Sequence, residues 1–86
     1  MPTLSFFHGI LIQMYWRDHP PPHFHARYAE HRVTFGIESL TKLTGDFPTT
    51  QERLVLRWAQ EHQDELREAW KLCQIGDPLF KIAPLP

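Results

Sequence analysis

The spacing of apolar residues changes halfway along this chain. Between residues 3 and 38, apolar and polar positions mostly alternate, which is the two-residue period of a β-strand. Between residues 49 and 76, apolar residues recur every three or four positions, which is the period of an amphipathic helix. A chain of 86 residues is long enough for one domain. We therefore predict a single α+β domain over residues 1–86, in which strands precede a helix.

The first half predicts a mostly antiparallel sheet of four strands. The expected strands cover residues 3–8, 10–17, 23–29 and 32–38. His8 and Gly9 form a predicted tight turn between the first two strands, and Ala29–His31 turns the chain between the last two. The prolines at 20–22 interrupt the sheet, because proline cannot donate a backbone hydrogen bond to a neighbouring strand. Residues 39–48 are polar and are expected to form a loop.

The second half predicts one long helix from Thr49 to Gly76. Thr49 and Glu52 have the spacing of a capping box, and Gly76 followed by Pro78 is a typical helix stop. The apolar segment 79–86 is expected to pack back on the sheet as an extended tail and to cover an edge. The predicted fold is thus β-β-β-β-α, with the helix packed on one face of a four-stranded antiparallel sheet.

Composition excludes some classes of protein. The net charge of −1 argues against a basic protein that coats nucleic acid. No apolar run approaches the roughly 18 residues of a membrane span, and the first residues lack a secretory pattern, so we expect a cytoplasmic protein without membrane contact. The single cysteine, Cys73, excludes an internal disulfide. A small domain without such a brace favours a partner protein or a homo-oligomer.

Residues 18–28 are the segment whose composition points to chemistry. They read Asp-His-Pro-Pro-Pro-His-Phe-His-Ala-Arg-Tyr, with three histidines, three prolines and one arginine in eleven positions. If a strand begins after Pro22, alternation divides its side chains between two faces. One face then carries His23, His25 and Arg27. The other carries Phe24, Ala26 and Tyr28.

One interpretation of this segment is a metal site formed by His19, His23 and His25. His23 and His25 lie two residues apart on one strand face, about 6.6 Å along the strand, so their rings can converge on one ion. Three histidines leave an open coordination position, and imidazole suits zinc, nickel or iron. A carboxylate can add an oxygen ligand or orient a ring. The candidates for this role are Asp18, Glu30 and Glu38.

A second interpretation needs no metal and makes the catalytic residues His23, His25, Arg27 and Tyr28. Either histidine can act as general acid or base, the arginine can stabilise a phosphate, and Tyr28 or His19 can assist. Such groups suffice to cleave RNA, whose 2′-hydroxyl is the nucleophile. The modest number of basic residues opposes this interpretation. A third interpretation is structural: a rigid proline corner in which the histidine rings bind backbone carbonyls.

The chain also resembles a known family from end to end. The residues that carry the resemblance are Met1–Ser5, Gly9–Tyr15, Asp18–His19, Pro21–His25, Tyr28, Trp58, His62, Glu65–Leu66, Trp70, Gly76, Pro78, Ile82 and Pro84–Leu85. They are similar to the small bacterial proteins grouped as domain of unknown function 4160. The resemblance implies membership of a toxin–antitoxin-like gene pair, and hence a small partner protein encoded nearby.

These observations lead to one expected function and one alternative from another class. We expect a small cytoplasmic bacterial protein of toxin–antitoxin type that acts with a partner and cleaves nucleic acid, RNA being the candidate substrate. Its working surface is expected to be His19, His23, His25, Arg27 and Tyr28. The alternative is a non-catalytic module that either binds a divalent metal through its histidine cluster or serves in protein interaction.

Overall fold

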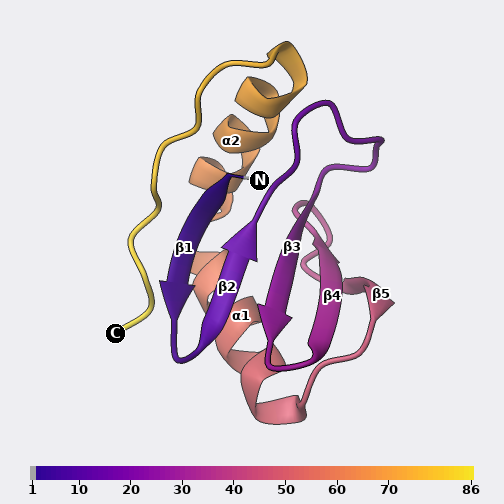
Figure 1. Cartoon of the computed structure of the whole chain (residues 1–86), viewed down its shortest axis with the longest axis vertical. Coiled ribbons are helices and arrows are strands. Elements are labelled where there is room, and N and C mark those ends of the chain that lie inside the picture. Colours follow the sequence, from indigo (N-terminus) through magenta and orange to yellow (C-terminus); the bar gives the residue numbers. More distant parts are fainter. Residues whose placement is uncertain (1) are drawn as a thin grey trace.

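The computed structural model describes residues 2–86, in which a five-stranded antiparallel sheet precedes two helices. The strands are β1 (Thr3–Phe7), β2 (Ile10–Gln13), β3 (His23–Tyr28), β4 (His31–Gly36) and β5 (Lys42–Gly45). They lie in the sheet in chain order. The helices are α1 (Thr49–Glu61) and α2 (Gln63–Ile75). Both helices lie on one side of the sheet (Figure 1), so its other side, here called the open face, has no helix of the described chain over it.

Tight turns and alternation build the sheet, as the sequence predicts. His8 and Gly9 both have positive φ, at 49° and 78°, the backbone that two-residue hairpins prefer. In the second hairpin His25 pairs with Thr34, and their neighbours Phe24 and Phe35 also pair. Phe24 and Phe35 are fully buried on the helix side. Every second residue of these strands is thereby directed to the open face.

The core lies between the sheet and the helices and is centred on Trp58. The Trp58 ring lies 5.4 Å from the ring of Phe7 and 6.0 Å from that of Phe24. From the helices, Val55, Ala59, Leu66, Ala69 and Cys73 are also buried. This packing confirms that the apolar stripe of the helical half covers one face of the sheet.

The predicted count of four strands was wrong, because residues 42–45 form a fifth. All four side chains of β5 are exposed, so the segment lacks the apolar alternation that identifies a strand in the sequence. What allows it to pair is Gly45, which has φ of +84°. A Cβ atom at Gly45 would lie 2.2 Å from the carbonyl oxygen of Arg32, so only glycine lets the two backbones approach here.

The prediction of one continuous helix was also wrong, because the helix breaks at His62. His62 has φ −120° and ψ 24°, which is not helical. A straight helix of 27 residues would be about 40 Å long, whereas the longest extent of the molecule is 33 Å. The break lets both segments remain on the sheet. The predicted capping box is absent too, since α1 begins after Pro48 without a side-chain cap, but Gly76 ends α2 in the left-handed conformation as predicted.

The end of the chain covers the free edge of β1, as expected. The Ile82 N–H donates to the carbonyl oxygen of Leu4 at 2.8 Å, and the indole of Trp58 donates to the carbonyl of Ala83 at 2.8 Å. Figure 1 shows residues 77–86 running beside β1. Ile82 and Leu85 are buried. Neither helix within residues 2–86 has the length and apolar character needed to cross a membrane.

Candidate metal centre

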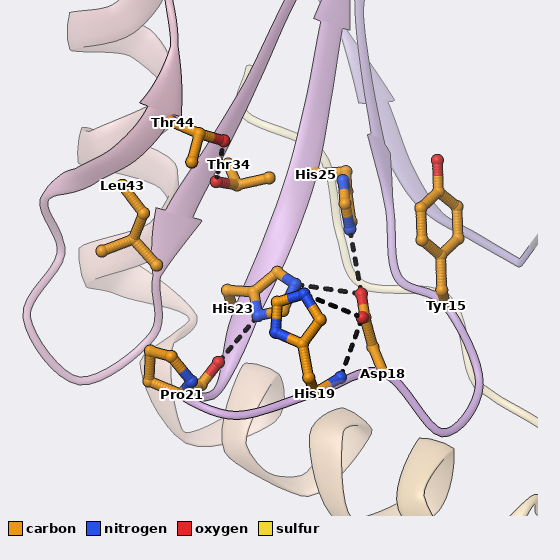
Figure 2. Close-up of a pocket in the computed structure, with 9 residues that line it drawn as sticks. All are labelled: Tyr15, Asp18, His19, Pro21, His23, His25, Thr34, Leu43 and Thr44. Atoms are coloured by element: carbon orange, nitrogen blue, oxygen red, sulfur yellow. Dashed lines mark hydrogen bonds and ion pairs between the residues drawn. The ribbon is translucent and has the colours of Figure 1, made fainter.

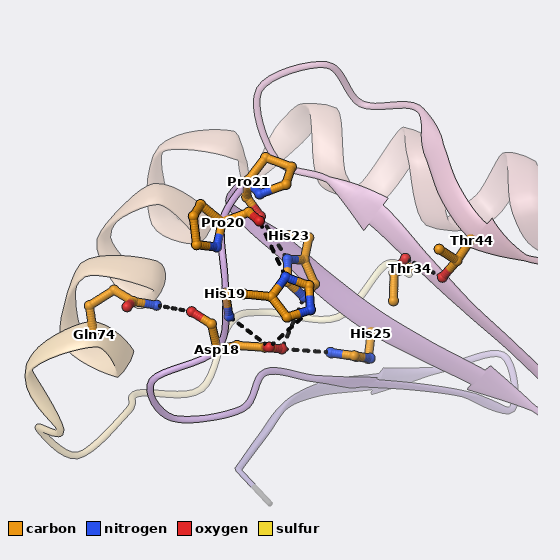
Figure 3. A network of polar contacts seen from close by, with 9 residues as sticks. All are labelled: Asp18, His19, Pro20, Pro21, His23, His25, Thr34, Thr44 and Gln74. Carbon is orange, nitrogen blue, oxygen red and sulfur yellow. Dashed lines mark hydrogen bonds and ion pairs between the residues drawn. The ribbon is translucent and has the colours of Figure 1, made fainter.

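The loop that carries Asp18 is held in place by the end of α2. β2 ends at Gln13, four residues before the predicted end, and the chain then turns toward the helix. The Arg17 N–H donates to the carbonyl of Cys73 at 3.1 Å, and the side-chain amide of Gln74 donates to the carbonyl of Asp18 at 3.1 Å (Figure 3). Helix and loop together therefore fix where the Asp18 side chain lies.

Asp18, His23 and His25 form the central cluster of this site. The Oδ2 atom of Asp18 lies 3.0 Å from Nε2 of His23 and 3.3 Å from Nε2 of His25 (Figure 2). These three atoms all lie within 4.8 Å of one another. His23 is buried, and the side chains of Asp18 and His25 are 17% and 21% exposed. Two imidazoles and one carboxylate thus converge at the edge of the open face.

The hydrogen bond of His23 to Pro21 determines how the His23 ring is used. Nδ1 of His23 lies 2.7 Å from the carbonyl oxygen of Pro21, and because a carbonyl only accepts, Nδ1 must donate. In a neutral ring Nε2 then carries a lone pair, which faces the Asp18 carboxylate. Two acceptors at 3.0 Å repel each other unless a cation lies between them. That cation is either a proton on Nε2 or a metal ion.

Asp18 is held in its ionised form. Burial disfavours the charge, but it is outweighed by the backbone N–H of His19, which donates to Oδ1 at 2.8 Å, and by the ring N–H groups that His25 and His23 offer when Nε2 carries the proton. The pKa of the Asp18 carboxyl therefore lies below its ordinary value. The ionised carboxylate is the form that binds metals.

His25 is held toward its neutral form. Burial lowers the pKa of the His25 imidazole, the bond to Asp18 acts in the opposite direction, and the nearby His23 lowers it further. The Tyr15 ring lies 4.1 Å from the imidazole and covers it on one side. A neutral imidazole and an ionised carboxylate are the protonation states that a divalent metal requires of its ligands.

A pocket of about 490 Å³ opens beside the cluster. Nine residues line it, namely Tyr15, Asp18, His19, Pro21, His23, His25, Thr34, Leu43 and Thr44 (Figure 2). Thr34 and Thr44 hydrogen-bond to each other through their hydroxyls at 2.7 Å. The pocket has room for a small ligand next to the three converging atoms.

The predicted site residues do not all come together. His23, His25 and Arg27 share the open face, while Tyr28 lies on the opposite face with its ring 6.2 Å from that of Phe47. The side chain of His19 is 82% exposed, with Nε2 3.7 Å from Oδ1 of Asp18. The ligand-bearing cluster in the structure therefore combines Asp18, rather than His19, with the two strand histidines.

Other predicted oxygen donors lie elsewhere. Glu38 pairs with Arg67, and Glu30 lies 3.7 Å from His31. Sequence reasoning missed Tyr15, Thr34 and Thr44 as pocket residues. The pairing of Thr34 with His25 follows from the predicted hairpin, but Thr44 lies in the strand that the sequence did not reveal.

The distances from the Asp18 carboxylate to the two imidazoles fit a metal ion of ordinary size. Donor atoms about 2.0–2.2 Å from a shared ion, at angles of about 90–110°, are about 2.8–3.6 Å apart. The two observed nitrogen–oxygen distances, 3.0 and 3.3 Å, agree with this range. The carbonyl that accepts from His23 and the N–H that donates to Asp18 are the usual outer partners of such ligands.

Comparison with known proteins places the chain in a family. No curated protein and no protein of known structure matches the chain. The family described as Domain of unknown function (DUF4160) matches residues 9–71, which include the whole cluster and most of both helices. The chain therefore belongs to the DUF4160 family.

Proposed function

We propose that this domain binds one divalent transition-metal ion through Asp18, His23 and His25. The proposal is carried by the 3.0 Å contact between His23 Nε2 and the ionised Asp18 carboxylate, because in a neutral His23 ring whose Nδ1 donates to Pro21 the lone pair of Nε2 faces that carboxylate. A metal ion satisfies both groups at once. Two imidazoles and one carboxylate suit zinc, iron or nickel. Three protein ligands leave coordination positions open, and the adjoining pocket gives a small molecule access to them.

Metal content of the untagged protein tests this proposal. After loading with zinc, iron(II) or nickel and gel filtration, we expect one ion per chain by elemental analysis. The variants His23→Ala, His25→Ala and Asp18→Asn should weaken binding by more than the 10- to 100-fold that loss of an outer partner typically costs.

Two single histidine variants serve as controls. His31→Ala removes a histidine near Glu30, away from the cluster, and should retain the ion. His19→Ala tests the set of three histidines that the sequence indicates, and should also retain it, because the exposed His19 ring points Nε2 at the far oxygen of Asp18. Metal lost equally from all five variants, or absent from the parent, would exclude the site.

A second candidate function is the metal-free cleavage of nucleic acid by a protein of toxin–antitoxin type. The observation in its favour is the pair formed by His25 and Asp18, in which a carboxylate orients an imidazole at the wall of a pocket. His25 would act as general base and Arg27, on the same face, would stabilise the phosphate. Tyr28 takes no part, because it lies on the other face of the sheet.

Expression in a bacterial host tests this second function. Induction of the parent should arrest growth, and His25→Ala should relieve the arrest while remaining folded. Harmless expression of the parent would exclude the toxin.

A partner or a second copy of the chain would find exposed apolar side chains at Trp16 and Ile75, which are 47% and 66% exposed near the end of α2. Light scattering of the purified chain distinguishes a monomer from a homo-oligomer.

A further inference from the structure

The acidic side chains of residues 2–86 all lie outside the strands of the sheet. Within residues 2–86 the five strands contain no aspartate or glutamate, although they contain Arg27, Arg32 and Lys42 and three histidines. The two helices hold five of the ten carboxylate side chains of the protein. A net charge of −1 therefore conceals a sheet whose charged side chains are cationic.

Two arginines meet on the open face. Arg27 of β3 pairs directly with Arg32 of β4, so that their side chains leave the sheet next to each other on the same side. Like charges placed directly opposite each other destabilise a sheet. Neither arginine forms an ion pair with a carboxylate among residues 2–86. An anion between the two guanidinium groups would relieve this repulsion, and phosphate matches the guanidinium geometry.

The same row of the sheet continues into apolar side chains. Arg27 pairs with Leu11 of β2, and Leu11 pairs with Phe6 of β1. Residues paired in this way lie on one face, and Phe6 is 61% exposed there. One row across four strands thus consists of an exposed ring, a leucine and two arginines. Exposed aromatic rings combined with cations are typical of surfaces that bind single-stranded nucleic acid.

We propose that the open face of the sheet binds single-stranded RNA, with Arg27 and Arg32 holding a phosphate and Phe6 stacking on a base. His25 and Tyr15 line a small pocket of about 100 Å³ together with these arginines, so RNA in this position also lies against the candidate general base. The inference rests on the second candidate function and supplies its binding surface. RNA is named rather than DNA because that function uses the 2′-hydroxyl as nucleophile.

Fluorescence anisotropy with a labelled 12-nucleotide RNA tests the two arginines. The variant Arg27→Gln/Arg32→Gln should bind at least about tenfold more weakly than the parent. The slope of log affinity against log salt concentration should fall by about 0.7, because the two arginines together hold one phosphate and each phosphate contact on a single strand contributes about 0.7. The matched control is Arg53→Gln/Arg57→Gln, which removes two exposed arginines from α1 and should bind like the parent. Equal affinities of the two double variants would overturn the proposal.

A second pair of variants tests the aromatic contact. Phe6→Ala should weaken binding by about tenfold, the loss expected for one stacked base. Ile75→Ala, which removes an equally exposed apolar side chain from α2, should not. An RNA duplex of the same sequence should bind more weakly, because its bases offer no free faces. Equally tight binding of single-stranded DNA would overturn the choice of RNA.

Failure of this proposal is distinguishable from failure of either function. All titrations contain EDTA, so the result does not depend on the metal site. The same samples are run on a denaturing gel, where binding without cleavage would count against the nuclease while leaving the binding surface intact. If the variant Arg27→Gln/Arg32→Gln still cleaves the RNA and binds it as tightly as the parent, the proposed binding surface is wrong.

Discussion

Replacing Asp18 by asparagine distinguishes a metal ion from a proton as the cation at the cluster. The amide has nearly the shape of the carboxylate, and its Oδ1 still accepts the His19 N–H. Its Nδ2 replaces Oδ2 and donates to Nε2 of His23, which lies 3.0 Å away. Nδ2 has a second hydrogen for Nε2 of His25, which lies 3.3 Å from the same position and accepts it once the ring proton moves to Nδ1. Without metal, Asp18→Asn therefore gains a hydrogen bond at His23, where a neutral parent has two facing acceptors, and keeps one at His25.

The expected change in stability follows from this contact. One buried hydrogen bond contributes a net of about 1 kcal/mol to stability. The free energy of unfolding of Asp18→Asn should therefore exceed that of the metal-free parent by about 1 kcal/mol at pH 8, which corresponds to a rise of about 4–8 °C in Tm. If a proton on His23 supplied the cation instead, the substitution would break a largely buried ion pair and cost about 3 kcal/mol. The two cases differ in sign.

Urea unfolding followed by tryptophan fluorescence measures this difference in EDTA at pH 8. With metal, the parent is expected to be more stable than Asp18→Asn. An ion at 100 times its Kd should raise the free energy of unfolding of the parent by about 2.7 kcal/mol and leave that of Asp18→Asn unchanged. Glu68→Gln, which neutralises an exposed carboxylate on α2, is the matched control. A large loss of stability in Asp18→Asn without metal would refute the argument from facing acceptors.

Three further outcomes are expected. The pKa of His25 is lower in the folded protein than in the unfolded chain, so the unfolded chain binds a proton first as the pH falls below about 6.5 and stability falls with pH in this window. The urea concentration at the unfolding midpoint should therefore fall between pH 8 and pH 5.5, and it should fall less in His25→Gln than in the parent. Gly45→Ala should lower stability by about 2 kcal/mol or more in thermal melts, while Gly36→Ala, whose one close contact is the movable Ser39 hydroxyl, should cost less. Ile82→Ala should cost about 2–5 kcal/mol in urea, and a loss under 1 kcal/mol would show that the tail does not stabilise the sheet.

Residue periodicity predicts the parts of this fold that bury apolar side chains. The two hairpins, the faces of β3 and the end of the helical half at Gly76 follow from alternation, turn residues and glycine. β5 was missed because all its side chains are exposed and its pairing depends on a backbone contact of Gly45. The break at His62 was missed because no proline or glycine marks it. It was also missed because the need for a break follows from the size of the whole molecule, which the helical residues do not encode.

The candidate site was predictable where it depends on local sequence. Alternation along β3 directs His23 and His25 to one face, as the structure shows. The choice between Asp18 and His19 as third member depends on how the loop turns, and that turn depends on hydrogen bonds to Cys73 and Gln74 of α2. Neighbouring residues cannot encode a contact with a helix more than fifty positions away.

If Asp18, His23 and His25 bind a metal ion as proposed, the way α2 holds the Asp18 loop would make that binding depend on the folding of α2. The three proposed ligands lie within eight consecutive positions, yet the carboxylate is placed by a helix that the ribosome makes only after all three of them. A nascent chain that has emerged only as far as β4 carries every ligand without the arrangement that joins them. Binding of an ion by this protein would thus require the folded domain, and the segment that carries the three side chains would not suffice.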